Sequence, residues 1–147
     1  MRRRWVHRLK AYVAGVLAAY VCAAVSYTQL NLGNVIEMGL SVTLADRLAA
    51  TWHDLLGLNL LLVLIAVGFA VAFFVASWIL RWLPQLRHLG YILAGGAAIY
   101  MLDYAMYKAM GDMHVLAVTR TGIGVMILSL AGAVGGYVFV RLLPEPN

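Results

Sequence analysis

Four long apolar segments constrain the fold of this chain more than any other feature. They are residues 11–29, 58–80, 89–108 and 121–140. A helix rises about 1.5 Å per residue, so about 20 residues cross a hydrocarbon core of about 30 Å. The segments lack the strict alternation that strands of a membrane barrel require. The sequence therefore predicts an all-α, integral membrane four-helix bundle, a single transmembrane domain over residues 1–147.

The composition agrees with a lipid environment. Hydrophobic residues make up 64% of the chain and charged residues only 12%. A soluble domain averages about 25% charged residues, so this chain has too little polar surface to cover a water-soluble globule. The net charge of +5 gathers at the ends of the apolar segments, where basic residues meet lipid headgroups. The expected partner is the lipid bilayer, and nucleic-acid binding is not expected.

The distribution of lysine and arginine predicts the orientation, because cytoplasmic loops carry the excess of basic residues. The inner set, with the N-terminus in the cytoplasm, is Arg2, Arg3, Arg4, Arg8, Lys10, Arg81, Arg87 and Arg141. The outer set is then Arg47, Lys108 and Arg120. We expect a multi-pass protein of the bacterial inner membrane with both termini in the cytoplasm.

A cleaved signal peptide is the alternative for the N-terminus. The stretch "MRRRWVHRLK" is a basic start, and "CAAVS" offers small residues for cleavage. The apolar run that follows is about 19 residues long, however, and signal peptides usually have 7–15. We therefore favour a retained first helix.

An amphipathic pattern occupies the connection between the first two apolar segments. On a helical wheel, residues 43–56 separate into a polar side and a side with Trp52 and the leucines. The charged or titratable members of the polar side are Asp46, Arg47, His53 and Asp54. The pattern predicts an additional interfacial helix, with its polar side in water. The stretch "QLNLGNVIEMG", residues 29–39, which is polar and punctuated by glycine, is expected to form turns.

Two interpretations of this helix are open. In one, it forms a lid over an outward-facing cavity, where His53 titrates near neutral pH and Asp54 fixes its tautomer. In the other, its polar side is only solvated. We favour the second, because the spacing of these polar residues does not itself indicate a reaction.

Asp103 lies inside the third apolar segment, near its outer end. The phenols that share its helical face are Tyr100, Tyr104 and Tyr107. An ionisable residue in a spanning segment faces the bundle or a water-filled cavity, which makes Asp103 a candidate functional residue. Arg120 and Lys108 are the expected counter-charges. A structural ion pair is the simpler interpretation, because Asp103 is not at the bilayer centre.

The sequence lacks the residues that several classes of reaction require. The histidines are His7, His53, His88 and His114, all outside the apolar segments, so none can ligate a haem at membrane depth. Zinc spacing, a P-loop, GxGxxG and GxSxG are missing, and the lone Cys22 has no partner for a disulfide. The sequence predicts no catalytic residue, no cofactor and no metal, and we do not expect an enzyme.

Small residues predict where the helices approach one another. Gly15 and Ala19 lie in the first apolar segment, "AGGAA" occupies 94–98, and Gly132 and Gly136 form a GxxxG in the fourth. Such residues permit close backbone contact in lipid. The pattern indicates packing within the bundle, with self-association as the alternative.

Several stretches resemble a group of small four-helix inner-membrane proteins of proteobacteria. These stretches are "YTQLNL", "DRLAATWHDLLGLN", "VGFAVAF" and "RTGIGVMILSLAGAVGGYVFVRL". The resemblance covers most of the chain and implies an inner-membrane location, but it transfers no catalytic residue. The polar positions that would correspond are Gln29, Asn31, Asp46, Arg47, His53 and Asp54.

The sequence thus favours an accessory or scaffold bundle, as a homo-oligomer or within a larger membrane complex. The alternative is a carrier or binder of a small polar or amphiphilic molecule. Its outward-facing cavity would lie near Asp103 and Arg120.

Overall fold

The computed structural model describes residues 2–39, 41–111 and 117–143. Every regular element in these residues is a helix, which confirms the all-α expectation for this part of the chain. In chain order the elements are α1 (Arg2–Glu37), α2 (Leu44–Gly57), α3 (Asn59–Ile79), η1 (Pro84–Leu86), α4 (Arg87–Ala109), η2 (Ala117–Arg120) and α5 (Gly122–Leu142).

Four helices are long and apolar enough to cross a membrane, as a multi-pass membrane protein requires. The qualifying stretches are Trp5–Glu37, Asn59–Ile79, Pro84–Ala109 and Gly122–Leu142. The ends of α3, α4 and α5 lie within two residues of the expected segments, because apolar runs of this length leave little choice of boundary.

The first helix differs from the prediction. α1 continues to Glu37 and has 36 residues, which gives a length of about 54 Å, well beyond a core of about 30 Å. The turn expected over residues 29–39 is wrong for its first part, since residues 29–37 are helical. Gly33 stays in the helix, and the chain turns only at Gly39, whose φ of 86° suits glycine.

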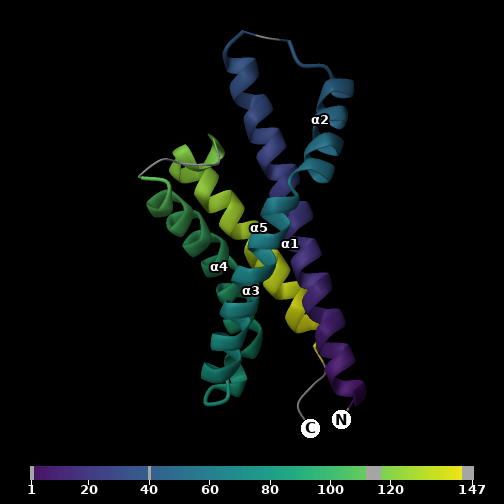
Figure 1. The fold of residues 1–147 in the computed structure, drawn as a ribbon, viewed down its shortest axis with the longest axis vertical. Coiled ribbons are helices and arrows are strands. Elements are labelled where there is room, and N and C mark those ends of the chain that lie inside the picture. The colour runs from purple at the N-terminus through teal and green to yellow at the C-terminus, as the bar shows by residue number, and fades with distance from the viewer. Residues whose placement is uncertain (1, 40, 112–116, 144–147) are drawn as a thin grey trace.

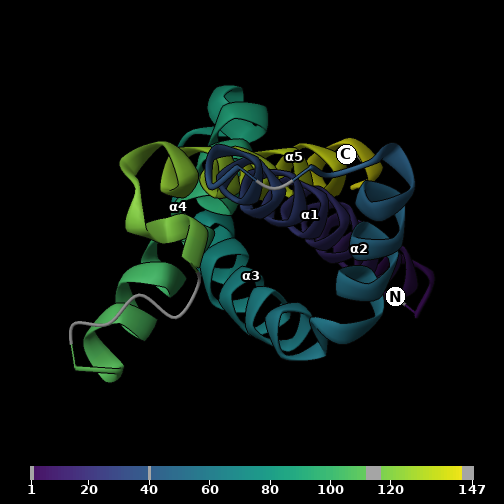
Figure 2. The ribbon, with the colours of Figure 1, turned by 90° about the horizontal axis from the view of Figure 1, so that it is seen from above.

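The helices form two antiparallel pairs around one core. α5 packs against α4 on one side and α1 on the other, while α3 contacts both α4 and α1, so α1 and α4 lie diagonally across the bundle. Figure 1 shows the start of α1 and the end of α5 at one end of the bundle, here called the N-terminal end. At the opposite, distal end, α1 and α2 rise beyond the ends of α4 and α5 (Figure 1). Figure 2 shows α2 beside α1, on the side away from α4.

Glycines permit the close contacts of α5. A Cβ atom added at Gly132 would lie 2.4 Å from the Gly95 carbonyl oxygen, and one at Gly136 would lie 2.1 Å from the Tyr91 carbonyl oxygen. On the other side of α5, a Cβ atom at Gly135 would lie 2.6 Å from the Gly15 carbonyl oxygen. The small-residue faces therefore serve packing within the chain.

Aromatic rings fill the half of the core near the N-terminal end. The Phe73 ring stacks on Phe139 with centroids 4.4 Å apart, and Tyr91 meets Phe139 edge to face at 5.1 Å. Phe69 is fully buried and lies 4.8 Å from Phe73. These contacts join α3, α4 and α5, and they fix the direction of the Tyr91 ring.

Candidate functional site

A capping box begins α2. The Thr43 hydroxyl accepts a hydrogen bond from the Asp46 backbone N–H at 3.2 Å. The Asp46 carboxylate accepts from the Thr43 backbone N–H at 2.9 Å and from the Thr43 hydroxyl at 2.7 Å. These hydrogen bonds hold the pKa of Asp46 below its ordinary value. Asp46 therefore has a structural role at the helix start.

Acidification is expected to fray the start of α2. The lowered pKa of Asp46 means that its capping contribution is present above the ordinary value of about 3.9 and is lost as the pH falls below it. Hydrogen exchange of the amides of residues 44–46 between pH 6 and pH 3, corrected for intrinsic rates, measures this loss. An Asp46→Asn variant should lack the response; an equal response in that variant would contradict the assignment.

A group of polar side chains joins α2 to the distal half of α1. We call it the α1–α2 seam; its members are Thr28, Gln29, Arg47, Thr51 and Asp54. The Arg47 guanidinium donates to the Gln29 side-chain oxygen at 2.8 Å, and the Gln29 amide donates to the Thr51 hydroxyl at 3.2 Å. The Thr28 hydroxyl is 2.8 Å from the Asp54 carboxylate and 2.9 Å from the Ala24 carbonyl oxygen.

Two tyrosines of α1 extend these contacts toward the core. The Tyr20 hydroxyl donates to the Leu55 carbonyl oxygen at 2.8 Å, at the end of α2. The Tyr12 hydroxyl donates to the Ala66 carbonyl oxygen of α3. The two phenols thereby tie α1 to the end of α2 and to α3.

The seam corrects the expectation for the polar side of α2. Arg47, Thr51 and Asp54 are partly buried against α1, whereas Asp46 and His53 are exposed. The polar side therefore does not face water as a whole. α2 runs antiparallel to the distal half of α1, because Gln29 bonds Arg47 and Thr51 while Tyr20, lower on α1, bonds Leu55. If α1 crosses a membrane, α2 stands upright rather than lying in its plane.

The apolar side of α2 points outward as a consequence. Leu44 is 75% exposed, Leu48 66%, Trp52 65% and Leu56 60%. No residue of α2 is fully buried. Leu55 packs against the core, but the hydrogen bonds to α1 come from the polar side, which is the reverse of the arrangement in a soluble amphipathic helix.

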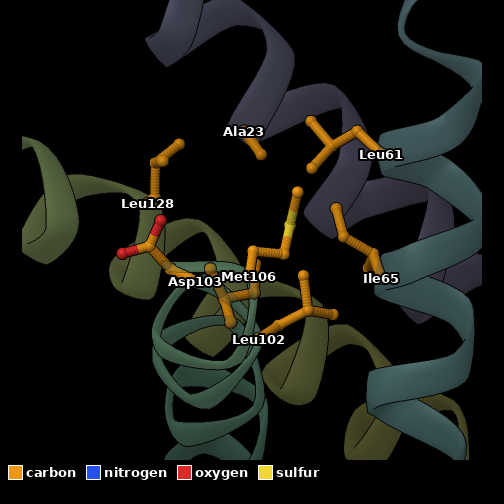
Figure 3. Close-up of a pocket in the computed structure, with 8 residues that line it drawn as sticks. Ala23, Leu61, Ile65, Leu102, Asp103, Met106 and Leu128 are labelled. Carbon is orange, nitrogen blue, oxygen red and sulfur yellow. The ribbon is translucent and has the colours of Figure 1, made fainter. Parts of the chain in front are cut away.

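Asp103 lines a small pocket among the four long helices. The lining residues are Ala23, Leu61, Ile65, Ile99, Leu102, Asp103, Met106 and Leu128. Figure 3 shows the Asp103 carboxylate on the side of Leu128, away from Leu61 and Ile65. The cavity offers about 20 Å³ for the centre of a water molecule, which suffices for roughly one water.

The structure does not assemble the predicted site around Asp103. Its carboxylate forms no hydrogen bond or ion pair with any described residue, so the expected pairing with Arg120 or Lys108 is absent there. Tyr100 and Tyr104 are 51% and 53% exposed and point away from the core, while Tyr107 is partly buried. None of the residues that line the pocket belongs to α2.

The titratable side chains do not form a metal site in the described part of the chain. No group of three or more His, Cys, Asp or Glu side chains comes together among those residues. His53 is exposed and His88 lies at the N-terminal end of α4. His114 lies outside the described residues.

Sequence reasoning missed the partners that α1 supplies to the seam. Thr28 is 1% exposed and lies in an apolar helix. A threonine hydroxyl in a helix usually bonds only the carbonyl oxygen of the preceding turn, so a partner in α2 was not expected. The signal was the adjacent pair Thr28 and Gln29, two polar side chains in a segment otherwise rich in alanine and valine.

Comparison of the chain with family models, curated proteins and solved structures gave no match.

Proposed function

We propose that the protein is an accessory or scaffold subunit of the bacterial inner membrane. The observation that carries the proposal is the distal hairpin, which comprises residues 28–37 of α1 and all of α2. Its polar side chains bond to one another in the seam, and its apolar side chains Leu48, Trp52 and Leu56 face outward. A contiguous exposed apolar face marks a surface that another protein or a membrane covers.

The position of the hairpin favours a protein partner. Gly15 of α1 contacts Gly135 of α5, so the start of α5 lies level with about residue 28 of α1, given equal rises of about 1.5 Å per residue. Residues 30–37 and the first half of α2 therefore extend beyond the start of α5. Leu44 and Leu48 are exposed in this part of α2. We infer that a neighbouring membrane protein covers this face.

Charge supports an orientation with both termini in the cytoplasm. The basic residues at the N-terminal end include Arg8, Lys10, Arg81, Arg87 and Arg141. The described carboxylates, Glu37, Asp46, Asp54 and Asp103, lie in the distal half. Under the positive-inside rule, this asymmetry favours a cytoplasmic N-terminal end and a periplasmic distal hairpin.

The alternative, a carrier of a small polar or amphiphilic molecule, has less support. Ligand pockets usually measure about 300–1,000 Å³, whereas the space beside Asp103 suits roughly one water. Apolar side chains form the rest of its lining. Asp103 is only partly buried near the distal end of the bundle, which needs no bound ligand to explain it.

Purification from native membranes tests the accessory role. The tagged protein, extracted in a mild detergent, should retain one or a few membrane proteins, or further copies of itself, in fixed ratio. A Leu48→Asn/Trp52→Asn double variant should lose that partner, because it makes the outward face polar. His53→Ala, an exposed change on the same helix, should retain it. Recovery of the wild-type chain alone would contradict the proposal. Recovery of a partner in equal amounts with the wild type, the double variant and His53→Ala would also contradict it.

A further inference from the structure

Arg47 is a cation without an ion pair. Its guanidinium donates to the Gln29 side-chain oxygen at 2.8 Å, and it forms no ion pair or other side-chain hydrogen bond with any described residue. A guanidinium has five N–H donors, so the neutral amide of Gln29 leaves most of them unused. The residue is only partly buried, so a ligand can reach it.

A ring of hydrogen bonds fixes the direction of this guanidinium. The Gln29 amide that accepts from Arg47 also donates to the Thr51 hydroxyl at 3.2 Å. That hydroxyl donates to the Arg47 carbonyl oxygen at 2.7 Å, so the ring begins and ends on Arg47. A side chain that is already ordered loses little further conformational entropy when it binds a ligand. Arg47 is thus prepared to bind an anion.

The two carboxylates of α2 are bonded elsewhere. Asp46 precedes Arg47 in the chain, but its carboxylate is held at the start of the helix by the Thr43 backbone N–H and hydroxyl. Asp54 lies two turns after Arg47, about 10 Å along the helix, and its carboxylate is 2.8 Å from the Thr28 hydroxyl. Neither pairs with the guanidinium, so α2 leaves the charge of Arg47 without a counter-charge.

The length of α1 sets the depth of Arg47 in a bilayer. Trp5, Trp78 and Trp82 are exposed at the N-terminal end, where tryptophan marks one interface of the membrane. Gln29, which holds Arg47, lies about 36 Å from Trp5 along the helix. A bilayer has a hydrocarbon core about 30 Å thick and measures about 40–45 Å with its headgroups. If α1 crosses a membrane, Arg47 therefore reaches the headgroups of the opposite leaflet.

We propose that the Arg47 guanidinium, held by Gln29 and Thr51, binds one anionic phosphate group. A guanidinium presents paired N–H donors that match two phosphate oxygens, and basic sites on membrane proteins recognise anionic headgroups. The phosphate is that of a phospholipid of the adjoining leaflet or a free phosphate ion. The site does not depend on the accessory role, because it uses the α1–α2 seam and not the outward apolar side chains.

Quenching of Trp52 fluorescence by brominated lipid tests the site locally. Trp52 is 65% exposed on the same helix as Arg47, and phenylalanine replaces Trp5, Trp78 and Trp82. The purified protein is reconstituted in phosphatidylcholine vesicles that contain a small share of acyl-brominated phosphatidylglycerol or phosphatidylcholine. Phosphatidylglycerol should bind beside Trp52 about fivefold more tightly, because the choline of phosphatidylcholine neutralises its phosphate.

Variants separate the fixed guanidinium from the surrounding charge. Arg47→Gln should remove the preference, a loss of about fivefold, and Arg47→Lys should keep about half of it, since an ammonium binds phosphate as a point charge. Gln29→Glu should also remove it, because the new carboxylate pairs with Arg47. Hydrogen exchange of residues 44–57 should stay unchanged in Gln29→Glu, which shows that α2 is still bound to α1. Arg120→Gln, which removes an exposed charge just before α5, should have little effect.

Inorganic phosphate distinguishes the two sources. A preference that phosphate leaves unchanged, relative to chloride at equal ionic strength, assigns the site to a lipid headgroup. A preference that phosphate abolishes assigns it to a free phosphate ion, and both results support the proposal.

Three results would overturn the site. They are equal quenching by the two lipids in the protein with Arg47, an Arg120→Gln loss as large as that of Arg47→Gln, and a full preference in Gln29→Glu. Equal quenching, together with a protein that co-purifies only while Arg47 is present, would assign the guanidinium to a carboxylate of that protein instead.

Discussion

Gly132→Ala and Gly136→Ala are expected to destabilise the bundle strongly, although each adds a single methyl group. The new Cβ atom would lie 2.4 Å and 2.1 Å, respectively, from a backbone carbonyl oxygen of α4. Backbone atoms cannot rotate away, so α4 and α5 must separate along the length of their contact. Overpacking of this kind costs about 1–3 kcal/mol, and occasionally more. Thermal or denaturant unfolding in detergent, followed by circular dichroism, measures the loss.

Gly33→Ala is the matched control. This glycine is also helical, but nothing lies within 4 Å of the position its Cβ would take. Alanine is the better helix former by about 1 kcal/mol, so the change should leave stability unaltered or raise it. Equal stability of Gly132→Ala and Gly33→Ala would show that α4 and α5 do not approach as closely as described.

The second large effect is expected in the α1–α2 seam. Gln29→Leu removes the acceptor of the Arg47 guanidinium and the donor to the Thr51 hydroxyl. A partly buried polar group that loses its partner costs about 1–3 kcal/mol, which corresponds to a roughly five-fold or larger increase in local opening. Hydrogen exchange of residues 44–57 should accelerate accordingly, while α3, α4 and α5 should exchange as before.

The control for this change is His53→Ala. His53 lies on the same helix, but it is exposed and forms no hydrogen bond with a described residue. Its replacement should leave the exchange of α2 unchanged. If Gln29→Leu also left the exchange unchanged, the seam would not be what holds α2 to α1.

The sequence predicts the helices well because their boundaries follow from apolar length. α3, α4 and α5 end where charged or turn-forming residues make burial in lipid costly. The end of α1 was less predictable. Gly33 in "NLGNV" indicates a turn when residues 30–37 are considered alone, yet the segment is helical beside α2. α1 contacts α2, a segment later in the chain, and no local pattern reports such a contact.

The candidate sites show the limit of helical wheels. The wheel separates the polar and apolar sides of α2 correctly, but it does not say which side meets the rest of the protein. Thr28 and Gln29 decide that question by bonding Asp54 and Arg47. For Asp103, the shared arc with Tyr100 and Tyr104 suggested one site, but α4 is rotated so that Asp103 is among the residues that line the pocket and both phenols point outward.

α2 binds α1 through its polar side and turns most of its apolar side outward. Nitroxide labels at single cysteines, placed in a Cys22→Ala background in lipid nanodiscs, test it most directly. Labels at residues 48 and 52 should be mobile and open to collision with oxygen, because Leu48 and Trp52 are 66% and 65% exposed. A label at residue 51, in the seam, should be immobile and shielded. The reverse pattern, with residue 51 mobile and residues 48 and 52 shielded, would contradict the claim.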